Sequence, residues 1–133
     1  MQQRLDHVRI VLDHTTHPGN IGSAARAMKV MGLDRLDLID PSAFPDSRAT
    51  ALASSADDLL DRARIHETLI QALDGCTLVM GTSARQRSVA QPLLDARLAA
   101  ERALAEQLLY AIAVEVRGRL RVESRRHRDL LDE

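Results

Sequence analysis

The sequence predicts an α/β fold in which a parallel sheet is flanked by helices. Through residue 83, short apolar runs alternate with segments of helical periodicity, and the links between them are short. Strands that alternate with helices in this way form parallel sheets with right-handed crossovers. At 133 residues the chain is long enough for one buried core. We therefore expect a single domain over residues 1–122, followed by a charged, frayed tail over residues 123–133.

The first strand and helix have distinct patterns. Residues 8–14, VRIVLDH, form a β-branched apolar run that ends in polar turn residues, which is typical of a buried strand. Apolar residues then recur at helical spacing over residues 20–31. Gly32 follows directly, where glycine closes helices in the left-handed conformation.

Five further elements are predicted before residue 84. They are a strand over residues 35–41, an Ala-rich helical stretch over 47–63, a brief strand over 63–68, a short helix over 68–76 and a strand over 77–83. Pro41 ends the first of these strands, and Gly75 closes the short helix.

The segment from residue 93 to residue 122 has no strand pattern. It is rich in Ala, Leu, Glu and Arg, which are strong helix formers, and Gly118 is its only helix breaker. We expect one long C-terminal helix that continues unbroken through residues 105–110. Roughly thirty helical residues would span about 45 Å, which exceeds the width of such a domain. This helix must therefore break or reach a second chain.

Composition excludes several classes of protein. The 18 Lys and Arg residues nearly balance 19 Asp and Glu residues, so any nucleic-acid binding depends on local patches. Cys76 is the only cysteine, which excludes an internal disulfide and fits a reducing compartment. The aromatic residues are Phe44 and Tyr110 alone, which argues against a base-stacking platform. Without a secretory segment or a membrane-length apolar run, we expect a cytoplasmic protein with no membrane partner.

The turn Pro18-Gly19-Asn20-Ile21-Gly22 follows the first strand, where parallel sheets bind ligands. One interpretation is structural: Asn20 caps the helix and Gly22 allows close packing. The other is functional. Arg26, beside the free N–H groups of a helix start, would favour a phosphate or a developing oxyanion.

A second turn, Gly81-Thr82-Ser83-Ala84-Arg85, follows the fourth predicted strand. It is either a plain turn with a helix cap or a ligand cradle, in which Gly81 permits close backbone approach and the hydroxyls supply hydrogen bonds. Arg85 and Arg87 would form a basic lip suited to an RNA phosphate, or a solvated surface.

Other chemistries lack their signatures. His14 and His17 have no carboxylate or cysteine at ligand spacing, so we expect no metal site. The sequence contains no G-x-S-x-G nucleophile elbow, no P-loop and no G-x-G-x-x-G.

Two motifs carry a resemblance to a known family. These are N-x-G-x-x-x-R at Asn20, Gly22 and Arg26, and G-T-S-A-R at residues 81–85. With the segments around them, from residue 8 to residue 97, they closely resemble the SpoU-type RNA 2′-O-methyltransferases of the SPOUT superfamily. The similar subgroup methylates a ribose in the tRNA anticodon loop. Residues 111–117, AIAVEVR, resemble the final helix of that domain.

The resemblance implies a knotted α/β homodimer that uses S-adenosylmethionine and acts on tRNA or another structured RNA. It assigns catalysis to Arg26 and Asn20 and cofactor binding to Gly81, Thr82 and Ser83. Substrate contacts are then expected from His17, Arg85 and Arg87. Dimer contacts would come from the first and last helices, the latter through Leu108, Ile112 and Val116.

Two family signatures are absent from the chain: a strand with a Phe-Gly-x-Glu type loop, and an Ile-Pro…Ser-Leu-Asn type segment. Because these build the knot and much of the cofactor pocket in the family, we expect the knot to be absent here. Three hypotheses follow. The chain is an RNA 2′-O-methyltransferase, a non-catalytic RNA-binding or dimerising module of that ancestry, or an unrelated small-molecule binder.

Overall fold

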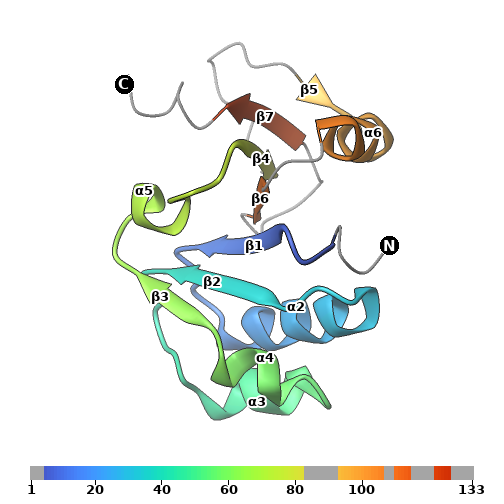
Figure 1. Cartoon of the computed structure of the whole chain (residues 1–133). Helices are drawn as coiled ribbons and strands as arrows, with labels where there is room; N and C mark the ends of the chain where they lie inside the picture. Colours follow the sequence, from blue (N-terminus) through green and yellow to red (C-terminus); the bar gives the residue numbers. More distant parts are fainter. Residues whose placement is uncertain (1–4, 83–92, 107–109, 115–121, 127–133) are drawn as a thin grey trace.

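A computed structural model describes residues 5–82, 93–106, 110–114 and 122–126, which form a twisted sheet with helices on both faces (Figure 1). The strand order is β3-β2-β1-β6-β4-β7-β5. The strands are β1 (Val8–Asp13), β2 (Arg35–Ile39), β3 (Arg64–His66), β4 (Leu78–Thr82), β5 (Leu93–Leu94), β6 (Tyr110–Val114) and β7 (Val122–Arg126). The helices are α2 (Pro18–Met31), α3 (Ser47–Ala53), α4 (Asp57–Asp61), α5 (Leu69–Ala72) and α6 (Ala96–Glu106). The first five strands in the order run parallel, and β7 is antiparallel to β4 and β5.

The predicted order of strands and helices through residue 82 is confirmed, with two differences. The stretch expected as one helix over 47–63 is two helices, because the chain turns at Ser54, whose φ is 56°. Helix α2 begins two residues earlier than predicted, with Pro18 in its first turn, where the missing proline N–H costs nothing. Gly32 closes α2 in the left-handed conformation, as expected.

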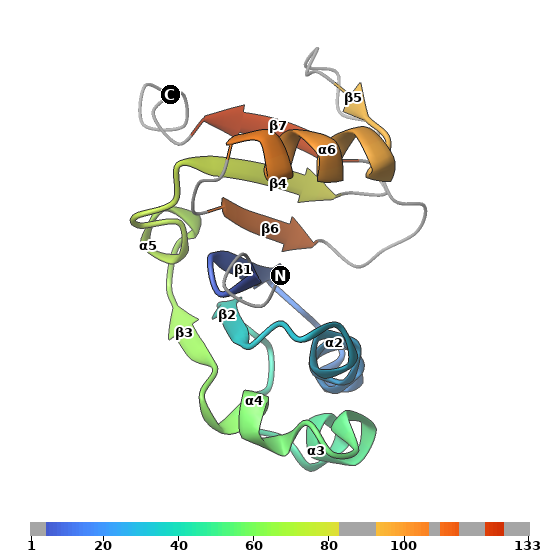
Figure 2. The same ribbon diagram turned by 45° about the vertical axis from the view of Figure 1, so that its right-hand side comes forward.

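The prediction of a long C-terminal helix is wrong. Helix α6 ends at Glu106, and Tyr110–Val114 forms β6 between β1 and β4 (Figures 1 and 2). Ile112 therefore lies in a central strand and not on a dimer-forming helix, while Leu108 and Val116 lie outside the described residues. The apolar run YAIAV is paired on both sides, and such pairing overrides the helix propensity of alanine.

The resemblance implies a final helix over residues 111–117, but residues 111–114 form a strand instead. Residues 122–126, where we expected the frayed tail to begin, form β7 against β4. The limit of the domain at residue 122 and the absence of the knot stay predictions.

The sheet buries an aliphatic core on each face. On one face the strands contribute alternate residues such as Ile10, Leu12 and Leu38, which pack with Ile21 of α2 and Ala99 of α6. On the other face a smaller cluster lies under α5 and comprises Val11, Ile39, Ala72, Leu73, Cys76 and Val79. Within the residues that the structure describes, no helix has both the length and the apolar character needed to cross a bilayer.

Helices α2 and α3 touch through backbone at Gly22. A Cβ built there would collide with the carbonyl oxygen of Ala49 and lie 3.0 Å from the backbone nitrogen of Ala53. Both alanines are fully buried. The expectation that Gly22 allows close packing is therefore confirmed, and this contact sets how closely α2 approaches α3.

Gly22→Ala should lower the free energy of unfolding by about 2–3 kcal/mol, because overpacking against rigid backbone outweighs the gain of about 1 kcal/mol in helix propensity. Gly19→Ala is the matched control. Its Cβ would meet the flexible end of Leu52 at 2.8 Å, and Leu52 is half exposed and can move away. Urea unfolding midpoints of the two variants measure the difference, and equal midpoints would show that the contact does not constrain α2.

Candidate active site at the carboxyl edge of the sheet

Both turns singled out in the sequence begin at the same edge of the sheet. Leu12 of β1 is in register with Val114 of β6, which is in register with Thr82 of β4. The carboxyl ends of β1 and β4 are therefore level, with one strand between them. At about 4.8 Å per strand, they lie roughly 10 Å apart, a spacing that a small ligand can bridge.

The start of α2 leaves polar groups available. His17 occupies the N-cap position, is exposed, and makes no side-chain cap hydrogen bond. Asn20 lies in the first turn rather than at the cap, so the interpretation that it caps the helix is wrong. Its half-buried side chain makes no hydrogen bond with any residue of the described ranges. The first turn also carries no acidic side chain, so its positive end is open to an anion.

Arg26 is exposed on α2, six residues beyond Asn20. This separation is about 9 Å along the axis, and helical side chains tilt toward the helix start, which aims Arg26 toward the carboxyl edge. No described residue forms an ion pair with it. Lys29, by contrast, pairs with Asp58 of α4 at 2.8 Å. The fold therefore uses Lys29 and leaves Arg26 available.

The second turn is described only at its start. Gly81 is half-buried and, with Thr82, ends β4, in register with Ala113 of β6 and Glu123 of β7. Ser83, Arg85 and Arg87 lie outside the described residues. The meeting of Arg26 with this turn therefore stays a prediction.

A polar cluster at this edge escaped the sequence analysis. The imidazole of His14 pairs through Nδ1 with Asp13 and through Nε2 with Asp40, at 3.4 Å for the latter. His14 and Asp40 both have positive φ, 49° and 40°, which non-glycine residues adopt uncommonly, although Asp and His do so more often than most. The signal in the sequence was an Asp at the end of each of two strands, since Asp13 is the last residue of β1 and Asp40 follows β2. Only the register shows that these two strands are neighbours.

The carboxylates raise the pKa of His14, first through the hydrogen bond and charge of Asp13 and, more weakly, through the charge of Asp40. Among the residues that the structure describes, no group of three His, Cys, Asp or Glu side chains is arranged to hold a metal ion.

Comparison with known proteins decides the family. The model of the SpoU rRNA methylase family matches residues 7–111. The chain belongs to the SpoU methylase family. A model of the arginine decarboxylase helical bundle domain also matches residues 99–133, but that region includes the strands β6 and β7, so the match does not describe the fold.

Curated relatives and solved structures agree with this assignment. The tRNA (cytidine/uridine/adenosine-2′-O-)-methyltransferase TrmJ of Pseudomonas aeruginosa is 58% identical over 93 residues, covering 70% of this chain and 36% of the relative. TrmJ of Pectobacterium atrosepticum is 49% identical over 118 residues, 89% of this chain and 48% of the relative. The crystal structure of TrmJ from Z. mobilis superposes with a TM-score of 0.76 at 34% identity, covering 84% of this chain and 51% of that one. The chain thus spans about half or less of the length of these relatives.

The titration of His14 tests the geometry of its cluster. Asp13→Asn should lower the His14 pKa more than Asp40→Asn does, because the Asp13 interaction is the stronger. Asparagine at position 40 tolerates positive φ, so the backbone is preserved. The measurement is the NMR titration of the imidazole protons, with Asp61→Asn on α4 as the control. The reverse order of shifts would contradict the paired geometry.

Proposed function

We propose that this chain carries the catalytic part of an RNA 2′-O-ribose methyltransferase that acts on tRNA with S-adenosylmethionine. The observation that carries the proposal is that the family match spans both turns, and that the fold starts α2 and ends β4 at one carboxyl edge. The relatives that match are named as tRNA 2′-O-methyltransferases. Because tRNA is the proposed substrate, we expect the protein to act in the cytoplasm.

The residues at the end of β4 suit S-adenosylmethionine. Gly81 has no side chain and is half exposed, so a flat nucleoside can approach its backbone. We assign cofactor binding to Gly81, Thr82 and Ser83. When bound, this cofactor supplies an electrophilic methyl group on a sulfonium.

The remaining task is to present the ribose 2′-oxygen in line with that methyl group, and positioning contributes most of the catalysis. Arg26 would stabilise the charge that develops on the 2′-oxygen or hold the adjacent phosphate. A guanidinium does not serve as a base at neutral pH, so the hydroxyl proton passes to water or to another base. Asn20, with a free amide, would orient the ribose, and His17, Arg85 and Arg87 would contact the RNA.

A homodimer is part of this proposal. The outer face of α2 exposes Arg26, Ala27, Val30 and Met31, and Val30 is 84% exposed. An exposed apolar stripe beside a candidate catalytic residue suits contact with a second copy. The predicted dimer contact through the last helix is not part of the proposal, because Ile112 lies in the strand β6.

The alternative function is a non-catalytic RNA-binding or dimerising module. It is favoured by the absence from the sequence of the Phe-Gly-x-Glu type loop and the Ile-Pro…Ser-Leu-Asn type segment. Binding of tRNA without methyl transfer would establish this alternative.

Arg26→Ala should lower kcat for methyl transfer to tRNA by about 100-fold or more, since removing one group that stabilises a developing oxyanion costs about 10²–10³. Affinity for S-adenosylmethionine should stay unchanged. Transfer of a radiolabelled methyl group measures the rate, and calorimetry measures cofactor binding. Arg48→Ala, at an exposed arginine of α3 that pairs with Asp46, is the control. Full activity of Arg26→Ala would refute the catalytic assignment.

A further inference from the structure

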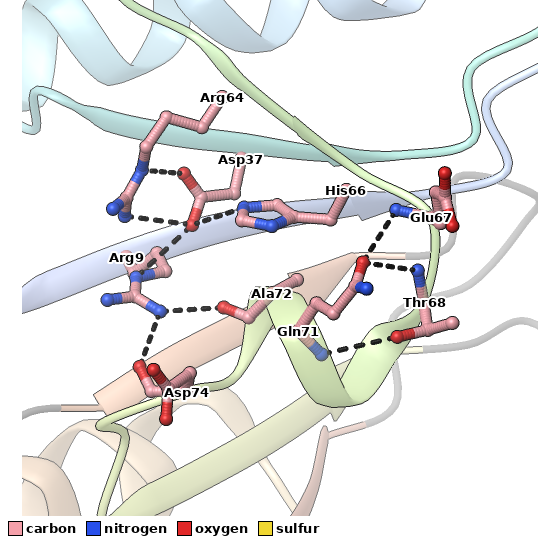
Figure 3. Close-up of polar contacts among 9 residues, drawn as sticks. All are labelled: Arg9, Asp37, Arg64, His66, Glu67, Thr68, Gln71, Ala72 and Asp74. Carbon is pink, nitrogen blue, oxygen red and sulfur yellow. Dashed lines mark hydrogen bonds and ion pairs between the residues drawn. The ribbon is translucent and has the colours of Figure 1, made fainter.

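A second group of charges lies on the face of the sheet under α5 and is centred in the middle of β2 (Figure 3). Its centre is Asp37 of β2, whose side chain is 1% exposed. Arg64 of β3 donates two hydrogen bonds to it, Nε to Oδ1 at 2.9 Å and a terminal nitrogen to Oδ2 at 3.1 Å. The Nε atom of Arg9 lies 3.2 Å from Oδ2, and His66 Nε2 lies 3.5 Å from the same oxygen.

Arg9 also joins the sheet to α5. Its terminal nitrogen donates to the carbonyl oxygens of Ala72 at 2.6 Å and Asp74 at 3.0 Å, at the end of that helix. A buried cation at a helix C-terminus satisfies the last carbonyls and complements the helix dipole. The charges of Arg9 and Arg64 are thus committed to Asp37 and to the α5 terminus.

A third arginine belongs to the same face without such a partner. Arg35 is in register with Arg9 and stands two residues before Asp37, so all three side chains project from one side of the sheet. The pKa of the buried Cys76 thiol is raised chiefly by burial, and Arg9, Arg35 and Arg64 each act to lower it. The register places the three arginines near one another on this face.

Arg35 is half-buried, and no residue in the described ranges forms a hydrogen bond or an ion pair with its side chain. The neighbouring Asp34 is exposed, and no ion pair joins the two. This face therefore carries three arginines and one buried carboxylate, and only Arg9 and Arg64 pair with that carboxylate. A half-buried guanidinium beside another cation is stabilised by an added anion.

We propose that Arg35, flanked by the exposed side of Arg64, binds a backbone phosphate of the substrate RNA. This inference rests on the proposed function and deepens it, because it adds an RNA contact away from the methyl-transfer edge. Strand β2 is about 17 Å long, so the two sites are separated by a distance comparable to about five stacked nucleotides of one strand at 3.4 Å each.

The phosphate could belong to RNA or be a free ion, and the salt dependence of binding distinguishes the two. Each phosphate neutralised by a protein cation contributes close to one unit to the slope of log affinity against log salt. Arg35→Gln should weaken tRNA binding about five- to tenfold and reduce that slope by about one. Arg48→Gln, at an exposed arginine that already pairs with Asp46, should change neither.

Three further measurements make the test decisive. The unfolding midpoint of Arg35→Gln should match that of the wild type, since Arg35 bonds to no described residue. Arg35→Lys should keep the salt slope while losing part of the affinity, because lysine retains the charge but not the planar fork. Inorganic phosphate at millimolar concentration should compete with tRNA more strongly in the wild type than in Arg35→Gln.

Equal tRNA affinity and equal salt slope in Arg35→Gln and the wild type overturn the proposal. So does phosphate binding at Arg35 without an effect on tRNA, which would be a free-ion site only. If the wild type binds tRNA with the Arg35-dependent slope but transfers no methyl group, the proposed function fails while this inference stands. If Arg26→Ala abolishes transfer and Arg35→Gln changes nothing, this inference fails while the proposed function stands.

Discussion

The close contact between Gly22 and the backbone of Ala49 is the constraint on which the arrangement of the candidate site depends. It lets α2 approach α3 without an intervening side chain, and so sets the distance between the two helices. Asn20 lies two residues before the contact and Arg26 four residues after it, within about one helical turn on either side. A glycine that looks like part of a catalytic motif is therefore first a packing residue, and the chemistry at positions 20 and 26 depends on it.

The sheet divides its polar residues between two ends. At the carboxyl edge, the side chains of His17, Asn20 and Arg26 form no hydrogen bond or ion pair with any described residue. The His14 cluster lies at the same edge, and its residues His14 and Asp40 have positive φ. Near the amino edge, Arg9, Asp37 and Arg64 bind one another and the end of α5. The unpaired polar side chains lie at the carboxyl end, where parallel sheets bind ligands. The charged group under α5 instead joins the sheet to the end of that helix through Arg9.

Local pattern was sufficient to predict the elements through residue 82. Alternating runs, Gly32 and Gly75 gave the right order, because each element there agrees with its own propensity. The region after residue 93 could not be predicted this way. YAIAV is rich in alanine and becomes a strand because β1 and β4 offer it two free edges, a fact of tertiary structure. The Arg9–Asp37–Arg64 group and the His14–Asp40 pair were missed for the same reason: each joins residues from different strands, and only the register brings them together.

We propose that the carboxyl edge between α2 and β4 holds the methyl donor. Amide resonances of the ¹⁵N-labelled chain, followed during titration with S-adenosylmethionine, show where the cofactor binds. We expect saturable shifts at Gly81, Thr82 and the first turn of α2, with the amides of Arg9 and Arg35 near the amino edge unchanged. Absence of shifts at saturating cofactor, or shifts confined to the amino edge, would contradict it.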